Sequence, residues 1–110
     1  MLLGDVASPR PGCFVVAQGD DGVRRFAMEL LADLRAGGVP AEGAFDKSFK
    51  AQMRRAGRSG FPVCAIIGGD EVKEGAVTLK DMRASVQNKV PRGDVMGRVQ
   101  TMLSEQGEEA

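Results

Sequence analysis

Two short apolar runs, each closed by glycine, constrain the fold of this chain most. Residues 13–19 read CFVVAQG and residues 61–69 read FPVCAIIGG. Continuous apolar runs of this length are typical of strands that are buried on both faces, as in a parallel sheet. Residues 20–38 space their apolar side chains as one face of a helix does, with Asp20 or Asp21 as the N-cap. Strand followed by helix predicts an α/β fold.

The rest of the chain continues this alternation. Residues 39–45 predict a weaker strand near a sheet edge, because Pro40 has no N–H to donate to a strand ladder. The other predicted elements are a helix over 47–58, strands over 76–82 and 85–91, and a last helix capped by Asp94. Together these elements predict a three-layer α/β domain, with a mixed, mostly parallel five-stranded sheet flanked by three helices.

Length and composition limit the function classes. The 110 residues suit one domain, which we place at 12–106, between a linker at 1–11 and a disordered tail at 107–110. Fifteen basic residues balance fifteen acidic ones, so electrostatic binding must come from local charge segregation. Cys13 and Cys64 lie in apolar runs, so we expect both to be buried free thiols. With no His and only two Cys, the composition argues against a zinc site. We expect a cytoplasmic protein that does not bind a membrane.

Charge segregation is found in one segment, DKSFKAQMRRAGRSG, at residues 46–60. It holds five basic residues and, after Asp46, no acidic one. At about 100° per residue, four of the cations share an arc of about 80°, opposite Phe49, Met53 and Ala56. We call these four the basic stripe: Lys47, Lys50, Arg54 and Arg58. Two interpretations stay open, a solvated basic face and a surface that follows the phosphates of a single-stranded nucleic acid.

Base recognition would need further polar groups near the basic stripe. Glu71, in a predicted turn GGDEVKEG, can accept from a base amino group, or be an ordinary exposed carboxylate. Lys80 and Asp81, at the end of the next strand, offer a donor and an acceptor. Phe61 and Phe49 are the remaining candidates for stacking on a base. A small flavodoxin-like enzyme is disfavoured, because the sequence has no phosphate-binding loop, metal set or nucleophile motif.

Two stretches carry a resemblance to a known family. KSFKAQMRRAGRSGFPVCAIIGGDEVKEGAVTLKDMR and CFVVAQGDDGVRRFAMELLADLRAGGV resemble the C-terminal anticodon-binding domain of class II aminoacyl-tRNA synthetases, most of all that of histidyl-tRNA synthetase, over about residues 12–104. The resemblance implies recognition of a tRNA anticodon loop, that of tRNA-His. The matching positions for anticodon contacts are Lys50, Gln52, Arg54, Glu71 and Lys80.

The resemblance also implies what this segment lacks. A histidine–tRNA ligase needs a separate catalytic domain for ATP and Mg²⁺, so we expect no cofactor and no catalysis in this segment, and residues 1–11 would link the two domains. The parent enzyme is expected to be a homodimer and the isolated domain a monomer. The alternative is a synthetase-like regulatory or protein-interaction module without aminoacylation activity. Zero net charge favours that alternative slightly, while the basic stripe favours RNA.

Overall fold

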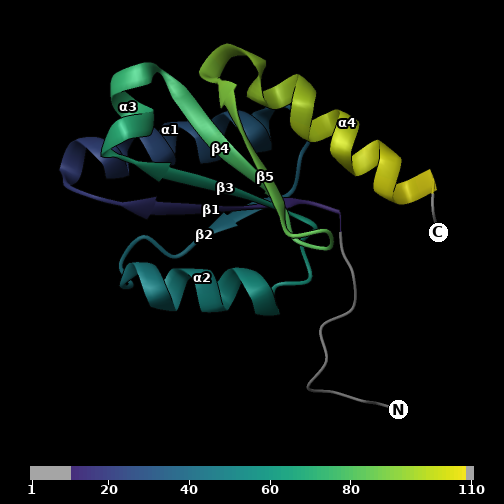
Figure 1. Ribbon diagram of the computed structural model, residues 1–110, viewed down its shortest axis with the longest axis horizontal. Coiled ribbons are helices and arrows are strands. Elements are labelled where there is room, and N and C mark those ends of the chain that lie inside the picture. The colour runs from purple at the N-terminus through teal and green to yellow at the C-terminus, as the bar shows by residue number, and fades with distance from the viewer. Residues whose placement is uncertain (1–10, 109–110) are drawn as a thin grey trace.

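The computed structural model describes residues 11–108 and contains one five-stranded sheet with helices on both faces (Figure 1). The strands are β1 (Cys13–Gln18), β2 (Ala41–Gly43), β3 (Val63–Gly68), β4 (Ala76–Asp81) and β5 (Val86–Pro91). The helices are α1 (Asp21–Ala36), α2 (Phe49–Arg58), α3 (Gly69–Glu74) and α4 (Val95–Glu108), with a short 3₁₀ helix, η1 (Arg92–Asp94), before α4. The α/β fold and the five strands predicted from the sequence are confirmed.

The strand order is β2-β1-β3-β4-β5. β1 pairs in parallel with β2 and β3, whereas β4 pairs antiparallel with β3 and β5. Four strands therefore run in one direction and β4 runs against them, which is the mixed sheet that the sequence predicts. β2 is a short edge strand, as expected beside Pro40, whose carbonyl accepts a hydrogen bond from the Cys13 N–H at 2.9 Å.

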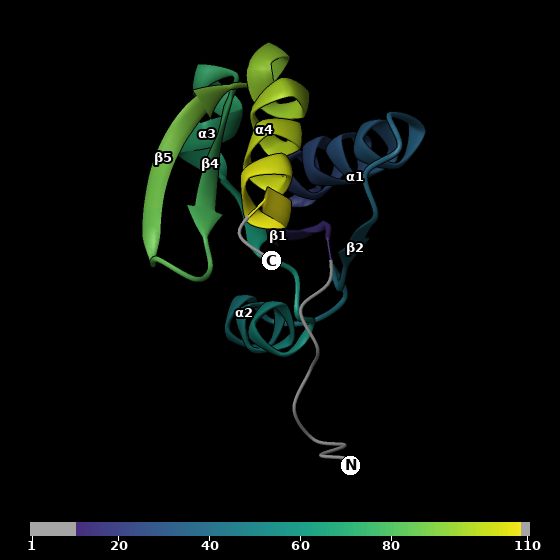
Figure 2. The same cartoon turned by 90° about the vertical axis from the view of Figure 1, so that its right-hand side faces the viewer.

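Helices cover the two faces of the sheet unequally. α1 and α4 lie on one face and α2 lies on the other (Figure 2). Leu30 and Leu34 of α1 and Val95 and Val99 of α4 are almost fully buried in the larger core, which confirms the apolar face predicted for residues 20–38 and shows that α4 has one as well. The smaller core lies under α2 and consists of Phe14, Val16, Ala44, Ala56, Phe61 and Cys64.

The two cysteines lie in different cores. Cys13 pairs with Val63, and Cys64 pairs with Phe14, so the two thiols are on neighbouring strands. Successive side chains of a strand point to opposite faces, which puts Cys13 in the larger core and Cys64 in the smaller one. Both thiols are free and buried, as predicted.

Three local features differ from the sequence predictions. The segment GGDEVKEG forms α3 rather than a turn, so the sheet is flanked by four α-helices instead of three. Asp94 lies in η1 rather than capping α4. α4 continues to Glu108, two residues into the predicted disordered tail, and the predicted linker 1–11 lies outside the described residues except for Pro11.

α3 forms because its two ends are stabilised locally. The Glu71 carboxylate reaches back to accept from the Gly68 N–H at 2.7 Å, which satisfies an N–H that a helix start leaves without an intrahelical partner. Gly75 has φ +65° at the other end, in the left-handed region that ends a helix and favours glycine. A glutamate three residues after the N-cap and a terminal glycine are helix signals that the sequence already contains.

Candidate nucleic-acid interface

The charged surface of α2 is the centre of the candidate site. Ser48 caps the helix by accepting from the Ala51 N–H at 3.2 Å. Four cations on this helix are exposed, and no carboxylate among residues 11–105 lies within ion-pair distance of them. These α2 cations are Lys50, Arg54, Arg55 and Arg58. The helix has no acidic residue in its first turn to complement its dipole.

Helix stability does not account for this charge pattern. Arg55 and Arg58 in the last turn interact favourably with the helix dipole, but Lys50 in the first turn does not. Arg54 and Arg58 are neighbours at i+4 and repel each other. A ligand with several negative charges would relieve this repulsion. The arrangement is therefore suited to a polyanion.

Lys47 and Arg55 differ from the prediction. Lys47 precedes the N-cap Ser48, so it is not on the helix, and its ammonium lies 3.8 Å from the exposed Asp46 carboxylate. Three of the four residues of the basic stripe thus lie on α2. Arg55 takes a place among the α2 cations although helical spacing set it apart from the stripe. Helical spacing alone does not show that Arg55 is exposed, because its exposure depends on how α2 packs on the sheet.

Gln52 is the clearest departure from the predicted contact set. Its side chain is 2% exposed, and its amide bonds to the backbone of β1. The Oε1 atom accepts from the Ala17 N–H at 2.9 Å, and Nε2 donates to the Ala17 carbonyl at 2.8 Å and to the Lys47 carbonyl at 3.0 Å. Gln52 therefore holds α2 on the sheet, and its buried amide does not face solvent where RNA would lie.

The early end of β2 explains why Gln52 is needed. β2 pairs with β1 only from Cys13 to Val15, and the next outward-facing backbone groups on that edge belong to Ala17. Buried backbone N–H and carbonyl groups need partners. The Gln52 amide supplies both a donor and an acceptor, as another strand residue would. Gln52 thus anchors α2 on the edge of β1, and Met53 of the same helix packs against the smaller core.

β4 and β5 continue the α2-side face beyond the helix. Figure 2 shows both strands to one side of α2, which packs over β1. Lys80 is opposite Cys64 of the smaller core in the β3–β4 pairing, so its side chain lies on the α2 side. Met82 donates its N–H to the Pro62 carbonyl at 2.8 Å, which keeps the end of β4 beside the loop that follows α2. The structure therefore brings Lys80 to the same face as the α2 cations.

Glu71 is an ordered acceptor on this side of the sheet. One carboxylate oxygen accepts from Gly68 and the other accepts from the Thr78 hydroxyl at 3.0 Å. Burial raises the pKa of Glu71, but the hydrogen bonds from Gly68 and Thr78 and the charge of Lys89 together hold it below the ordinary value. Glu71 is thus ionised and fixed in place, unlike an ordinary exposed carboxylate. Each oxygen keeps a second lone pair for a ligand donor.

Asp81 and Phe61 have local structural roles. Asp81 Oδ1 accepts from the N–H groups of Arg83 and Ala84 at 2.9 and 3.1 Å, which shapes the β4–β5 turn. Phe61 is 5% exposed in the smaller core, so the prediction that it could stack on a base is wrong for this structure. Phe49 is partly buried against the same core. Of the two predicted stacking candidates, only Phe49 is thus left partly accessible.

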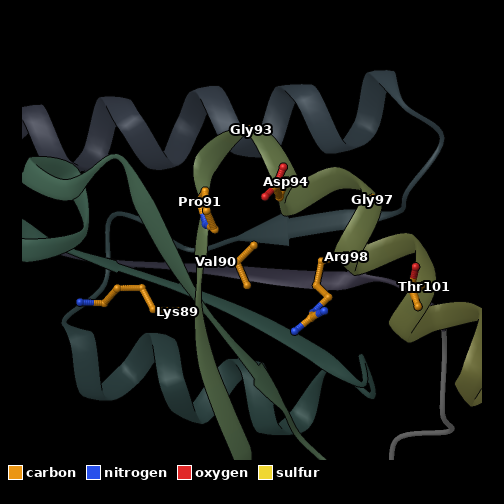
Figure 3. A pocket seen from close by; sticks show the side chains of 8 residues that line it. All are labelled: Lys89, Val90, Pro91, Gly93, Asp94, Gly97, Arg98 and Thr101. Carbon is orange, nitrogen blue, oxygen red and sulfur yellow. The ribbon is translucent and has the colours of Figure 1, made fainter.

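A separate hollow lies between β5 and the start of α4. Its volume is about 570 Å³ and its lining is Lys89, Val90, Pro91, Gly93, Asp94, Gly97, Arg98 and Thr101. Figure 3 shows Arg98 extending from α4 toward β5, while the Lys89 ammonium points to the other side of that strand. The hollow contains none of the predicted RNA-contact residues.

No helix within residues 11–108 is both long and apolar enough to cross a membrane.

Comparison with known proteins agrees with this geometry. The family model described as an anticodon binding domain matches residues 12–102. A histidine–tRNA ligase of Nitratidesulfovibrio vulgaris (strain DP4) is 38% identical over 100 residues, which cover 90% of this chain and 24% of that protein. The ligase of Sorangium cellulosum is 41% identical over 92 residues, with 83% and 21% covered. The chain thus spans about a quarter of the length of these relatives.

Solved structures give the same fold. The apo histidyl-tRNA synthetase of S. aureus superimposes with a TM-score of 0.71 at 24% identity, over 86% of this chain and 23% of that one. The RNA binding domain of threonyl-tRNA synthetase from Cryptosporidium parvum gives a TM-score of 0.72 at 15% identity, over 84% and 23%. The family model covers most of the chain, and the relatives agree over the same residues. The chain therefore belongs to the anticodon-binding domain family.

Proposed function

We propose that this chain binds the anticodon loop of a tRNA, and that it does so as the recognition domain of a histidine–tRNA ligase. The observation that carries the proposal is the set of α2 cations, exposed on one helix without a carboxylate partner among the described residues. Family membership and the ligase relatives support the choice of tRNA as the polyanion. Such a domain contributes discrimination between tRNAs rather than bond-making chemistry.

Within this proposal the residues divide by task. Lys50, Arg54 and Arg58, with Arg55, hold phosphates, because long cationic side chains on a helix can follow a backbone without reading its bases. Glu71 and Lys80 contact base edges as a fixed acceptor and a donor. Gln52 positions the helix. Lys47 and Asp81 are peripheral, since the first lies before the helix and the second shapes a turn.

The parent protein is proposed on the same basis. The relatives are about four times longer than this chain, and we assign the ATP, Mg²⁺ and aminoacylation steps to the part that this chain does not span. We propose a homodimeric parent in the cytoplasm and a monomeric isolated domain. Sedimentation of the 110-residue chain would test the last point directly, because a dimer would double its mass.

Binding of a labelled tRNA-His anticodon stem-loop at several salt concentrations tests the proposed function. If all four α2 cations meet phosphates, log K falls with log salt at a slope of about −2.8, from about −0.7 per phosphate of a single strand. Arg54→Ala should weaken binding and make that slope shallower by about 0.7. Arg25→Ala is the matched control, because Arg25 is an exposed arginine of α1 on the opposite face of the sheet.

Two results would contradict the proposed function. One is equal loss of affinity in Arg25→Ala and Arg54→Ala, which would mean that net charge rather than the α2 surface attracts RNA. The other is equal affinity for a loop with a scrambled anticodon, which would exclude base reading.

A further inference from the structure

We infer that β5 supplies a base-reading side chain, Gln87, which acts beside Lys80. This inference rests on the proposed function and adds a residue that neither the sequence pattern nor the family resemblance singles out. Gln87 is directly opposite Lys80 in the antiparallel pairing of β4 with β5. Directly opposite residues share a face, with Cβ atoms about 4.5–5.5 Å apart. Gln87 therefore lies on the α2 side, next to Lys80.

Four polar side chains form the α2-side surface of this strand pair. They are Thr78 and Lys80 on β4 and Gln87 and Lys89 on β5, which we call the β4–β5 platform. Thr78 donates to Glu71 at 3.0 Å, and the Lys89 ammonium donates to the Glu74 carboxylate at 2.8 Å. These two are thus bound to carboxylates of α3.

The other two members of the platform are not engaged in this way. Within residues 11–105, no hydrogen bond or ion pair involves the side chains of Lys80 and Gln87. Gln87 is exposed, so its side chain buries no apolar surface and does not stabilise the fold in that way. A free amide beside a free ammonium offers a ligand donors and an acceptor at one spot.

The amide of Gln87 suits an unpaired base better than a phosphate. A glutamine amide donates and accepts at the same time, which matches the adjacent donor and acceptor on a base edge. The amide carries no charge, so it adds little to the electrostatic attraction between the protein and the RNA phosphates. Arg58, four residues before Pro62, is at the same end of the sheet, because Met82 binds the Pro62 carbonyl at 2.8 Å. A base on the platform would thus have a phosphate-binding cation nearby.

The test uses the 110-residue chain with Gln87→Ala and, as a matched control, Asn88→Ala. Asn88 is the next amide on the same exposed strand, but it is opposite Leu79 and faces the α4 side. The probes are tRNA-His anticodon stem-loops, the natural one and three in which one anticodon position is changed. We expect Gln87→Ala to weaken binding of the natural loop about fivefold or more, with the salt slope unchanged. Asn88→Ala should bind like the parent chain.

The pattern across the loops separates the inference from the proposed function. Gln87→Ala should lose its preference at one anticodon position and keep it at the others. Natural-loop affinity equal in Gln87→Ala and Asn88→Ala, while Arg54→Ala still weakens binding, would overturn the role of Gln87 and leave the proposed function standing. If Arg54→Ala also had no effect, both would be wrong. Gln87→Glu, which keeps the acceptor and loses the N–H donors, should be at least as weak as Gln87→Ala.

Discussion

Removing the Gln52 amide tests how the RNA-facing helix is held on the sheet. Gln52→Ala leaves the buried N–H and carbonyl of Ala17 without partners. An unsatisfied buried group costs about 1–3 kcal/mol, so the two groups together predict a loss of about 2–6 kcal/mol. The whole stability of a domain is about 5–15 kcal/mol. Gln52, a polar residue in a basic segment, should therefore contribute as much to the free energy of unfolding as a large core side chain does.

Urea denaturation followed by circular dichroism measures this loss as a change in the free energy of unfolding. Gln100→Ala is the matched control, because Gln100 is exposed on α4 and its loss should change stability by less than about 0.5 kcal/mol. Gln52→Glu separates hydrogen bonding from size. Its carboxylate can accept from Ala17 but cannot donate to the two carbonyls, so it should be unstable at pH 7. Its deficit should shrink on acidification, when a protonated carboxyl regains a donor.

A loss below about 1 kcal/mol in Gln52→Ala would refute the reasoning. It would mean that water or a shift of α2 satisfies Ala17 equally well. The prediction is independent of RNA, so it can fail while the proposed function holds.

Three further predictions concern stability and reactivity. The pKa of Glu71 is lower in the folded chain than in the unfolded chain. Its ionised carboxylate therefore stabilises the fold above the unfolded pKa of about 4.3, and this stabilisation is lost as pH falls through the folded pKa. Urea titrations should show Glu71→Gln less stable than the parent chain at pH 7, with the difference closing in acid. Gly75→Ala should lower stability by about 1 kcal/mol because Gly75 has φ +65°. Gly57→Ala should raise it by about 0.5–1 kcal/mol, because a Cβ at this position of α2 would lie in open space. Thermal melts in which both variants shifted the melting temperature in the same direction would contradict this. Burial raises the pKa of the Cys64 thiol to about 12 and that of Cys13 further, so a thiol reagent at pH 8 should label both only after unfolding, and rapid labelling of the native chain would be inconsistent with the structure.

Most secondary structure could be predicted from the sequence because local periodicity reports it. The apolar runs at β1 and β3, the spacing of Val23 through Leu34, and the alternation along β4 are properties of consecutive residues. The short helix α3 was missed because it has only six residues and glycines flank it, although Glu71 and Gly75 are both helix signals. Three of the four α2 cations could be predicted for the same reason, since helical spacing alone separates Lys50, Arg54 and Arg58 from Met53 and Ala56.

The sequence by itself determined the order of the five strands and the three longer helices, the apolar faces and the segregation of charge, because each depends on neighbours along the chain. The tertiary structure alone decided that Gln52 is buried, that Phe61 is part of a core, and that Gln87 is opposite Lys80. Those facts depend on where β2 ends and on the register of β5, which are set by contacts between distant residues. A polar side chain in a basic segment can bind RNA or replace a missing strand, and only packing distinguishes the two.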